Sequence, residues 1–222
     1  MARKAPRRTA ERILETSLSL FNRYGEPGVS TAQISSELNI SPGNLYYHFP
    51  AKDVLVNALF DQYVAQLTEL LPAAPDVADV ENAWFFLHAL FERVWAYRFL
   101  YRDINHLLSN NRHLEQSMKD VLLDKTSAFK SLLQGLSHAG VLQLEPGDRD
   151  DLAVHMVVML TWWLSYEYVR DPRNAMADEH AERSVLRGAL HVMGLLLPHL
   201  DAASRAHLRQ LRSAYMPSAP AA

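Results

Sequence analysis

The segment that decides the fold is SPGNLYYHFPAK, residues 41–52. Serine followed by proline is typical of a helix start, because the serine hydroxyl accepts a hydrogen bond from a free backbone amide and proline is favourable at the first helical position. The sequence therefore predicts a short helix from Pro42 to Phe49. Pro50 ends it, because proline cannot continue the helical hydrogen bonding.

Leu45 and Phe49 lie four residues apart on this short helix, so they share one face. We expect both to contact the core, which turns Tyr46, Tyr47 and His48 away from it. Three exposed rings on two turns of helix indicate a binding surface. The alternative is that the two tyrosines pack against the following helix and that His48 only caps this one.

Double-stranded DNA is the ligand that makes use of all the features of residues 41–52. A helix of this width fits the major groove, where rings contact thymine methyl groups and hydroxyl groups contact phosphate oxygens. Gly43 leaves room for close approach of the backbone, and Lys52 adds a cation at the edge of the surface. We therefore expect this helix to bind DNA.

Two further helices are predicted before this segment. Residues 9–24 carry apolar side chains at helical spacing, and Gly25 is suited to the left-handed residue that ends such a helix. Ser30 and Gln33 are spaced as a capping box at the start of the next helix, which ends at Asn39. Two short helices joined by a turn of this length form a helix-turn-helix.

The rest of the chain also shows helical periodicity and no sustained strand pattern. Further helices are expected at residues 51–71, 79–97, 99–109, 112–138, 148–170, 178–197 and 201–214. The sequence thus predicts an all-α protein with two domains. We expect a three-helix DNA-binding domain over residues 1–55 with a basic arm at residues 1–8, a larger helical domain over residues 56–215, and a disordered tail at residues 216–222.

Composition limits the classes of protein that fit this chain of 222 residues, of which 49% are hydrophobic and 21% charged. The absence of cysteine excludes a disulfide scaffold, a thiolate zinc finger and a cysteine nucleophile. No apolar run is long enough to cross a membrane, and the N-terminal residues do not form a secretory signal. We therefore expect a soluble, cytoplasmic protein with no membrane partner.

Charge is distributed unevenly along the chain, whose formal net charge is −3. Residues 1–52 hold seven lysines and arginines against four acidic residues, whereas residues 53–222 hold 15 against 21. Such a chain is suited to contacting a polyanion with one end only. The alternative is a polar N-terminal segment without a nucleic-acid partner.

Residues 9–59 resemble the DNA-binding domain of TetR-family transcriptional regulators in helix length, spacing and motif. The matching elements are Tyr24-Gly25, Val29-Ser30-Thr31, Ile34 to Leu38, the run Gly43-Asn44-Leu45-Tyr46-Tyr47-His48-Phe49, and Lys52-Asp53-Val54-Leu55. The resemblance implies a protein that binds a palindromic DNA operator as a dimer and responds to a small molecule through an all-helical second domain. The family's common mode of action is repression by occluding polymerase.

The resemblance also implies a role for each matching residue. Thr31, Tyr47, His48 and Lys52 occupy positions that contact the DNA backbone, and Ser41, Gly43, Asn44 and Tyr46 occupy positions that contact base edges. Pro42 stands where many relatives have a polar or charged residue, so base recognition from that position is in doubt. The basic residues of the arm, Arg3, Lys4, Arg7 and Arg8, either reach a flanking minor groove or form a free tail.

Two segments of the larger domain, residues 152–168 and 184–200, are apolar around nearly their whole circumference. On the outside of a monomer they would expose a large apolar patch. The family's usual arrangement is a four-helix bundle formed by the last two long helices of each subunit. We therefore expect a homodimer through the helices near residues 150–170 and 178–198. The alternative is that both helices are buried within one subunit.

Aromatic and methionine side chains of the larger domain indicate where a small-molecule effector would bind. The predicted pocket comprises Trp84, His88, Phe91, Trp95, His106, Phe129, Met159, Trp162 and Tyr166. Its apolar wall favours a hydrophobic effector, which would select a conformer in which the fourth helix has swung. The alternative is that these residues form only the domain core.

Two other functions compete with that of a DNA-binding regulator. An enzyme built on a helical bundle would need a catalytic or metal-binding constellation, but none of the ten histidines lies in a His-Glu-x-x-His motif, and Asp103-x-x-His106 occurs once. The sequence therefore predicts no catalysis, no metal and no cofactor. The other alternative is an interaction adaptor that has lost DNA binding, against which Tyr47, His48 and Lys52 argue.

Overall fold

A computed structural model describes residues 6–215 and confirms the all-α fold. The helices are α1 (Pro6–Tyr24), α2 (Thr31–Glu37), α3 (Pro42–His48), α4 (Lys52–Leu70), η1 (Leu71–Asp76), α5 (Val80–Ala96), α6 (Arg98–Arg102), α7 (Ile104–Asn110), α8 (Arg112–His138), α9 (Pro146–Arg170), η2 (Asp178–His180), α10 (Ala181–Gly194), η3 (Leu197–His199) and α11 (Ala202–Tyr215). Within this part of the chain, no helix is both long and apolar enough to span a membrane.

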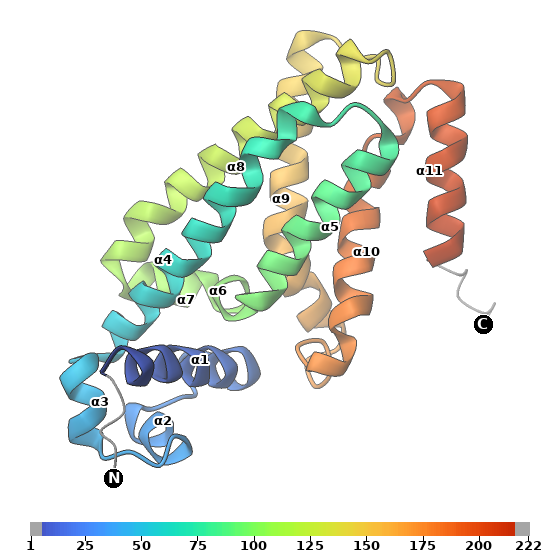
Figure 1. Ribbon diagram of the computed structural model, residues 1–222. Coiled ribbons are helices and arrows are strands. Elements are labelled where there is room, and N and C mark those ends of the chain that lie inside the picture. The colour runs from blue at the N-terminus through green and yellow to red at the C-terminus, as the bar shows by residue number, and fades with distance from the viewer. Residues whose placement is uncertain (1–5, 216–222) are drawn as a thin grey trace.

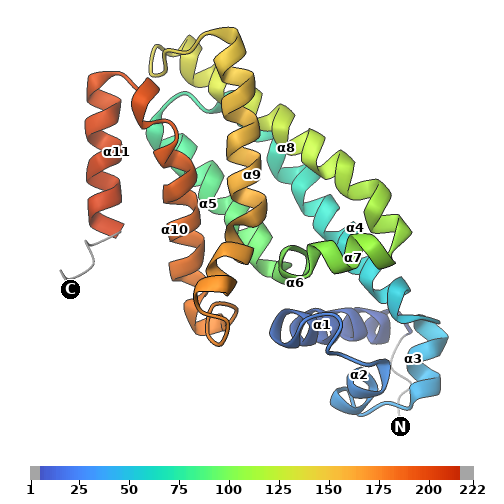
Figure 2. The same ribbon diagram turned by 180° about the vertical axis from the view of Figure 1, so that it is seen from behind.

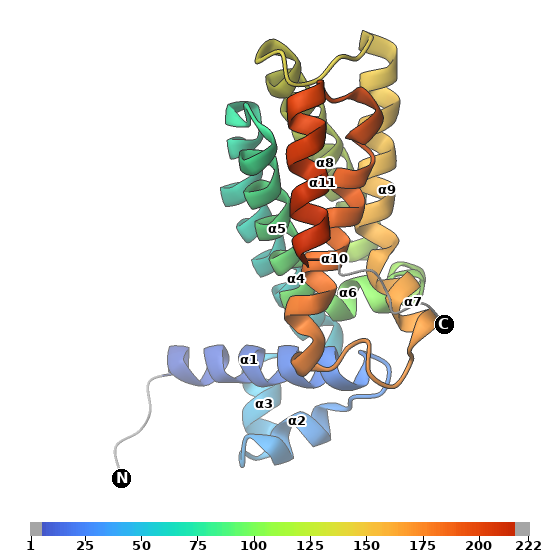
Figure 3. The same cartoon turned by 90° about the vertical axis from the view of Figure 1, so that its right-hand side faces the viewer.

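The helices form a small unit at one end of the molecule and a larger bundle beside it (Figure 1). The small unit consists of α1, α2 and α3, and α4 runs from it along the bundle. The other long helices of the bundle are α5, α8, α9 and α10, and α11 packs on the outside against α10 and α5 (Figure 3). The short helices α6 and α7 lie between the bundle and α1 (Figure 2). The small unit therefore meets the bundle through α4, α6 and α7.

The helix-turn-helix forms as its local sequence predicts. Ser30 Oγ accepts a hydrogen bond from the Gln33 amide at 3.1 Å, and Ser41 Oγ accepts one from the Asn44 amide at 3.2 Å. Serine thus caps both α2 and α3. Gly25 has a φ of 81°, the left-handed conformation that ends α1.

The core of the small unit fixes the orientation of α3. Ile13 of α1, Ile34 of α2, Leu45 of α3 and Leu55 of α4 are all fully buried. Burying a side chain of this size stabilises the fold by about 1.5–3 kcal/mol relative to exposing it. The Leu45 face of α3 therefore points inwards, and the opposite face is presented to solvent.

The structure differs from the sequence prediction at the N-terminus. The first helix begins at Pro6 rather than at residue 9, so residues 6–8 of the expected arm belong to α1. Proline is favourable in the first turn of a helix and arginine is a good helix former, which accounts for the earlier start. Residues 1–5 and the expected tail, residues 216–222, lie outside the described residues.

Two expected helices are divided in the structure. Residues 99–109 form α6 and α7, separated at Asp103, whose carboxylate accepts a hydrogen bond from the Glu26 amide at 3.0 Å. This contact with the α1–α2 turn holds the backbone in a bend. Residues 178–197 form a 3-10 turn followed by α10, which ends at Gly194. Pro198 lacks an amide hydrogen and cannot extend that helix.

Gly188 allows a close approach between helices of one chain. A Cβ atom at this position of α10 would lie 2.3 Å from Cε1 of Phe91 on α5. The structure thus identifies α5 as the helix that packs closely against Gly188. A Cβ atom at Gly194 would instead meet the flexible end of the Arg212 side chain.

Candidate nucleic-acid interface and effector site

The exposed face of α3 carries the rings that the sequence predicts to bind DNA. Tyr46 is 47% exposed and Tyr47 is 79% exposed, whereas Leu45 is fully buried. The His48 ring lies 5.1 Å from the Tyr47 ring, edge to face. The predicted outward orientation therefore holds for Tyr46 and Tyr47, whereas His48 is partly buried. Ser41, Gly43 and Asn44 are also exposed and extend the same surface.

Thr31 and Lys52 lie beside this face and border a shared hollow. Thr31 Oγ1 is within 3.0 Å of the Tyr46 hydroxyl, a hydrogen bond that joins α2 to α3. Thr31, Tyr46 and Lys52 line a shallow hollow of about 640 Å³ where the starts of α2 and α4 approach α3. Three of the predicted DNA-binding residues therefore come from three helices and meet at one place on the surface.

Lys52 has a partner that the sequence does not reveal. Its ammonium lies 2.8 Å from Oε1 of Glu26 and donates to the Glu26 backbone carbonyl at 2.6 Å. The Lys52 side chain is about one-quarter exposed. The lysine therefore fixes the start of α4 to the α1–α2 turn. The sequence feature that could have indicated this ion pair is Glu26, an acidic residue within the basic N-terminal segment.

The end of α1, just before this turn, is attached to the end of α5 and to α6 through hydrogen bonds. Asn22 Nδ2 donates to the Ala96 carbonyl at 2.8 Å, and Asn22 Oδ1 accepts from the Phe99 amide at 3.1 Å. Asn22 is buried, so both bonds form away from water. Together with the bond from the Glu26 amide to Asp103, they attach the end of α1 to α6. A displacement of α6 would therefore act directly on the DNA-binding unit.

The residues predicted to line one effector pocket are distributed over several places in the structure. Phe91 and Phe129 are buried in the core, and Trp84 and Trp95 are nearly so. His88 borders a hollow of about 300 Å³ between α5 and α10, which Trp95 also lines. This hollow is thus lined by two of the nine predicted pocket residues.

Of the remaining four residues of the predicted pocket, three are exposed and Met159 is partly buried. His106 on α7 is half exposed, and its Nε2 lies 3.6 Å from Oε2 of Glu26, beside the DNA-binding unit. Met159, Trp162 and Tyr166 on α9 border an open, mainly apolar groove of about 420 Å³ that faces away from the core. These positions differ from the prediction because helical spacing gives a residue's neighbours on its own helix but not the helix that it faces.

An exposed apolar stripe follows the whole outer side of α9. Val154, Val158, Trp162 and Tyr166 recur every four residues, and each is between 44% and 54% exposed. Val169 continues the stripe and is 77% exposed. Large apolar side chains gathered on one face indicate an interface with another molecule.

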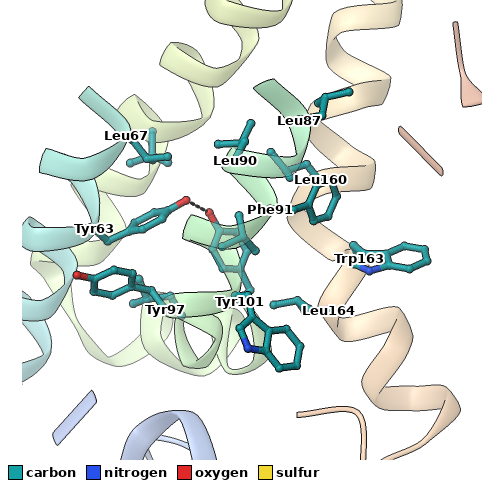
Figure 4. Close-up of a cluster of buried hydrophobic side chains, with 14 of the residues drawn as sticks. Tyr63, Leu67, Leu87, Leu90, Phe91, Tyr97, Tyr101, Leu160, Trp163 and Leu164 are labelled. Atoms are coloured by element: carbon teal, nitrogen blue, oxygen red, sulfur yellow. Dashed lines mark hydrogen bonds between the residues drawn. The ribbon is translucent and has the colours of Figure 1, made fainter. Parts of the chain in front are cut away.

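A polar cluster of Tyr63, Tyr101 and Lys125 lies inside the bundle and joins α4, α6 and α8. All three side chains are fully buried. The Lys125 ammonium donates to the Tyr101 hydroxyl. Figure 4 shows the hydrogen bond between the Tyr101 and Tyr63 hydroxyls. Burial lowers the pKa of Lys125 to about 7 and raises the pKa of Tyr63. The sequence feature that could have indicated this cluster is the lysine that stands among the core-facing apolar side chains of residues 112–138.

The side chains of residues 6–215 do not form a group of three or more histidines, aspartates and glutamates that could hold a metal ion. Three features described above are candidates for function: the exposed face of α3, the apolar stripe along α9, and the buried cluster of Tyr63, Tyr101 and Lys125.

Comparison with known proteins agrees with a DNA-binding unit followed by a regulatory bundle. Residues 13–59 match the family model described as bacterial regulatory proteins of the tetR family, and residues 62–208 match the model described as bacterial transcriptional repressor. The structure of a TetR-family transcriptional regulator from Marinobacter aquaeolei VT8 is 29% identical. The match covers 94% of this chain and 99% of that one, with a TM-score of 0.79.

Two further proteins are similar to this chain over most of its length. The HTH-type transcriptional repressor KstR2 of Rhodococcus jostii is 23% identical over 208 residues, which is 88% of this chain and 94% of that protein. SmeT, solved as a complex with triclosan, is 17% identical over 89% of this chain and 94% of its own, with a TM-score of 0.60. Because the family models match most of its length, the chain belongs to the TetR family of bacterial DNA-binding transcriptional regulators of the repressor type, which are not enzymes.

Proposed function

We propose that the protein is a ligand-responsive repressor that binds a palindromic operator as a homodimer and is released by a small molecule. The observation that carries the proposal is the exposed face of α3, where rings and small polar residues stand together on a helix held rigidly from behind by Leu45. A protein that binds an operator acts where the DNA is, so we propose that this protein acts in the cytoplasm.

The residues of the surface formed by α3 and the start of α2 divide into two roles. Ser41, Gly43, Asn44 and Tyr46 would face base edges, and Thr31, Tyr47 and His48 would contact phosphates, which set the position of the protein on the duplex. Lys52 contributes mainly through Glu26, by holding α4 in place. Its charge reaches a phosphate only in competition with that carboxylate.

The stripe along α9 supports a dimer formed through α9 and α10. A second copy would cover Val154, Val158, Trp162 and Tyr166 with the same surface of its own, as a two-fold interface requires. Burial lowers the pKa of His191, which borders the adjoining groove, so this imidazole is neutral at neutral pH and does not oppose its own burial. A two-fold dimer suits half-sites about one helical turn apart.

We expect the effector to release DNA by changing the position of α6. This helix carries Tyr101 towards the interior of the bundle and is attached to α1 through Asn22 on its other side. An effector that binds a conformer with displaced α6 or α4 would shift the two recognition helices out of register with the DNA grooves. SmeT, which shares the fold, is known as a complex with a small molecule.

The experiment that tests this proposal is selection of bound duplexes from a random library, followed by titration of the selected duplex. We expect the selected sites to share a palindrome. Tyr47→Ala should weaken binding about tenfold, since a lost DNA contact costs roughly 1–3 kcal/mol. Phe85→Ala is the matched control, because Phe85 is an exposed ring, 61% accessible, on α5 away from α3.

Two outcomes would contradict the proposal. One is a wild-type protein that selects no sequence, which would favour an interaction adaptor. The other is a Tyr47→Ala variant that binds the selected duplex as tightly as the Phe85→Ala control.

A further inference from the structure

Lys125 is buried without a counter-charge. Its side chain is inaccessible to solvent on α8, and none of the ion pairs between described residues includes it. The hydrogen-bond partner of its ammonium is the neutral Tyr101 hydroxyl. The ammonium also lies 4.8 Å from the centroid of the Tyr101 ring and 5.6 Å from that of the Tyr63 ring.

Such a lysine is costly if its only role is packing. A buried ion pair is often no better than apolar side chains of the same volume, and a buried charge without a partner is worse. Methionine or leucine would fill this position of the α8 stripe without that cost. The lysine avoids this cost either by losing its proton or by gaining a partner that supplies a negative charge.

The surroundings of the cluster suit the rest of a small organic molecule. Leu67, Leu90, Phe91 and Leu160 lie around the tyrosines in the core between α4, α5 and α9 (Figure 4). These side chains provide an apolar environment next to three polar atoms.

A buried polar group on α9 also lacks a partner. The Thr161 hydroxyl is buried and makes no hydrogen bond within the described chain. Thr161 lies one turn before Ser165 on α9, on the same helix face. Ser165 Oγ donates to the Tyr101 carbonyl at 3.3 Å, so this face of α9 is turned towards α6.

We propose that Lys125, Tyr101 and Tyr63 form the polar anchor of the effector site, and that the effector is a carboxylic acid with an apolar body. One carboxylate oxygen would accept from the Lys125 ammonium and the other from a tyrosine hydroxyl. This inference rests on the proposed function, to which it adds the chemical class of the ligand.

The position of the cluster links such an acid to the DNA-binding unit. The Tyr63–Tyr101 hydrogen bond joins α4 to α6, and a carboxylate inserted between the hydroxyls would separate these two helices. The start of α4 is fixed to the α1–α2 turn through Lys52, and α6 is fixed to α1 through Asn22. Separation of α4 from α6 would therefore be passed to the DNA-binding unit from both sides.

The test compares acids with their neutral amides on the full-length protein. The probes are hexanoate, decanoate, phenylacetate and naphthoate, each beside its primary amide, in calorimetric titrations at about pH 8, above the pKa of Lys125. Wild type is compared with Lys125→Met and with Lys119→Met, which removes an exposed lysine of the same helix. Repeating the titrations in buffers of different ionisation enthalpy measures proton uptake.

We expect at least one acid to bind wild type about tenfold or more tighter than its amide, a difference of about 1.4 kcal/mol. Binding should take up a proton, because the carboxylate favours the charged form of Lys125. Lys125→Met should lose both the preference for the acid over its amide and the proton uptake on binding. Lys119→Met should keep both. The proposal is overturned if no acid binds, if amides bind equally well, or if Lys125→Met behaves like wild type.

Operator release, measured separately with the same acids, distinguishes the two proposals. An acid that binds with proton uptake but leaves the DNA complex intact confirms the anchor and contradicts the proposed mode of release. If the protein binds its operator but none of the acids, the proposed function is supported and the proposed carboxylate anchor is contradicted.

Discussion

Lys125 shows how one buried side chain makes stability depend on pH. Its pKa falls from 10.5 in an exposed lysine to about 7 in the folded protein, because burial disfavours the ammonium. Below pH 7 the folded and unfolded chains both carry the proton, and the folded state bears the full cost of the buried charge. Between pH 7 and 10.5 only the unfolded chain holds it, so the free energy of unfolding rises with pH.

The prediction concerns Lys125→Met, which removes this titration while it keeps most of the side-chain volume. Between about pH 7 and pH 9 the free energy of unfolding of wild type should rise relative to the variant, by up to about 1.4 kcal/mol per pH unit. Tyr63 and Tyr101, whose pKa values are raised, stay protonated in this range. Urea denaturation across the range measures the difference, and parallel profiles for the two proteins would contradict the burial of an ionisable amine.

Packing at the level of elements depends on how closely two helices approach. The contact between α10 and α5 exists because Gly188 has no side chain where the Phe91 ring lies. In contrast, Gly147 in the first turn of α9 has no neighbouring atom within 4 Å of its Cβ position. The same substitution should therefore have opposite effects in these two helices.

Gly188→Ala should lower the free energy of unfolding by about 1–3 kcal/mol, since the methyl group must displace a buried ring. Gly147→Ala, its matched control, should leave stability unchanged or raise it by up to about 1 kcal/mol, because alanine is the better helix former. Chemical denaturation of both variants is the measurement. Equal stability of the two would mean that α5 and α10 are not in close contact.

The molecule as a whole has two functional surfaces of different character. The α3 face is polar and aromatic and is suited to DNA, whereas the α9 stripe is apolar and is suited to a second copy of the chain. The short helix α6 is attached to α1 through Asn22 on one side and, through its own Tyr101, to Lys125 of α8 on the other. Its five residues are too few for a stable helix alone, so its position depends on both neighbours.

Trp162→Asp tests whether the exposed apolar stripe of α9 forms the dimer interface. A charge at this place would have to be buried in the dimer, so the variant should be monomeric and should bind the operator less tightly. Sedimentation velocity gives the oligomeric state, with Phe85→Asp on α5 as the control that should stay dimeric. A dimeric Trp162→Asp variant would place the interface elsewhere.

Local sequence by itself determined the helices and the outward face of α3. The bounds of α8, residues 112–138, agree with the prediction, because a continuous apolar stripe and a capping residue suffice to define a helix. The Ser41 cap and the four-residue spacing of Leu45 and Phe49 likewise suffice to turn Tyr46 and Tyr47 outwards. These properties depend on residues within one or two turns of each other.

Only the tertiary structure decided which helix each face meets. Tyr101 pairs with Lys125 across 24 positions of the sequence and with Tyr63 across 38. Lys52 reaches Glu26 across 26 positions, and the pocket predicted from aromatic spacing is divided among the core, a groove and the α7 surface. Helical periodicity gives the direction of a side chain relative to its own axis. The crossing of two axes depends on how their side chains interlock, which no single helix contains.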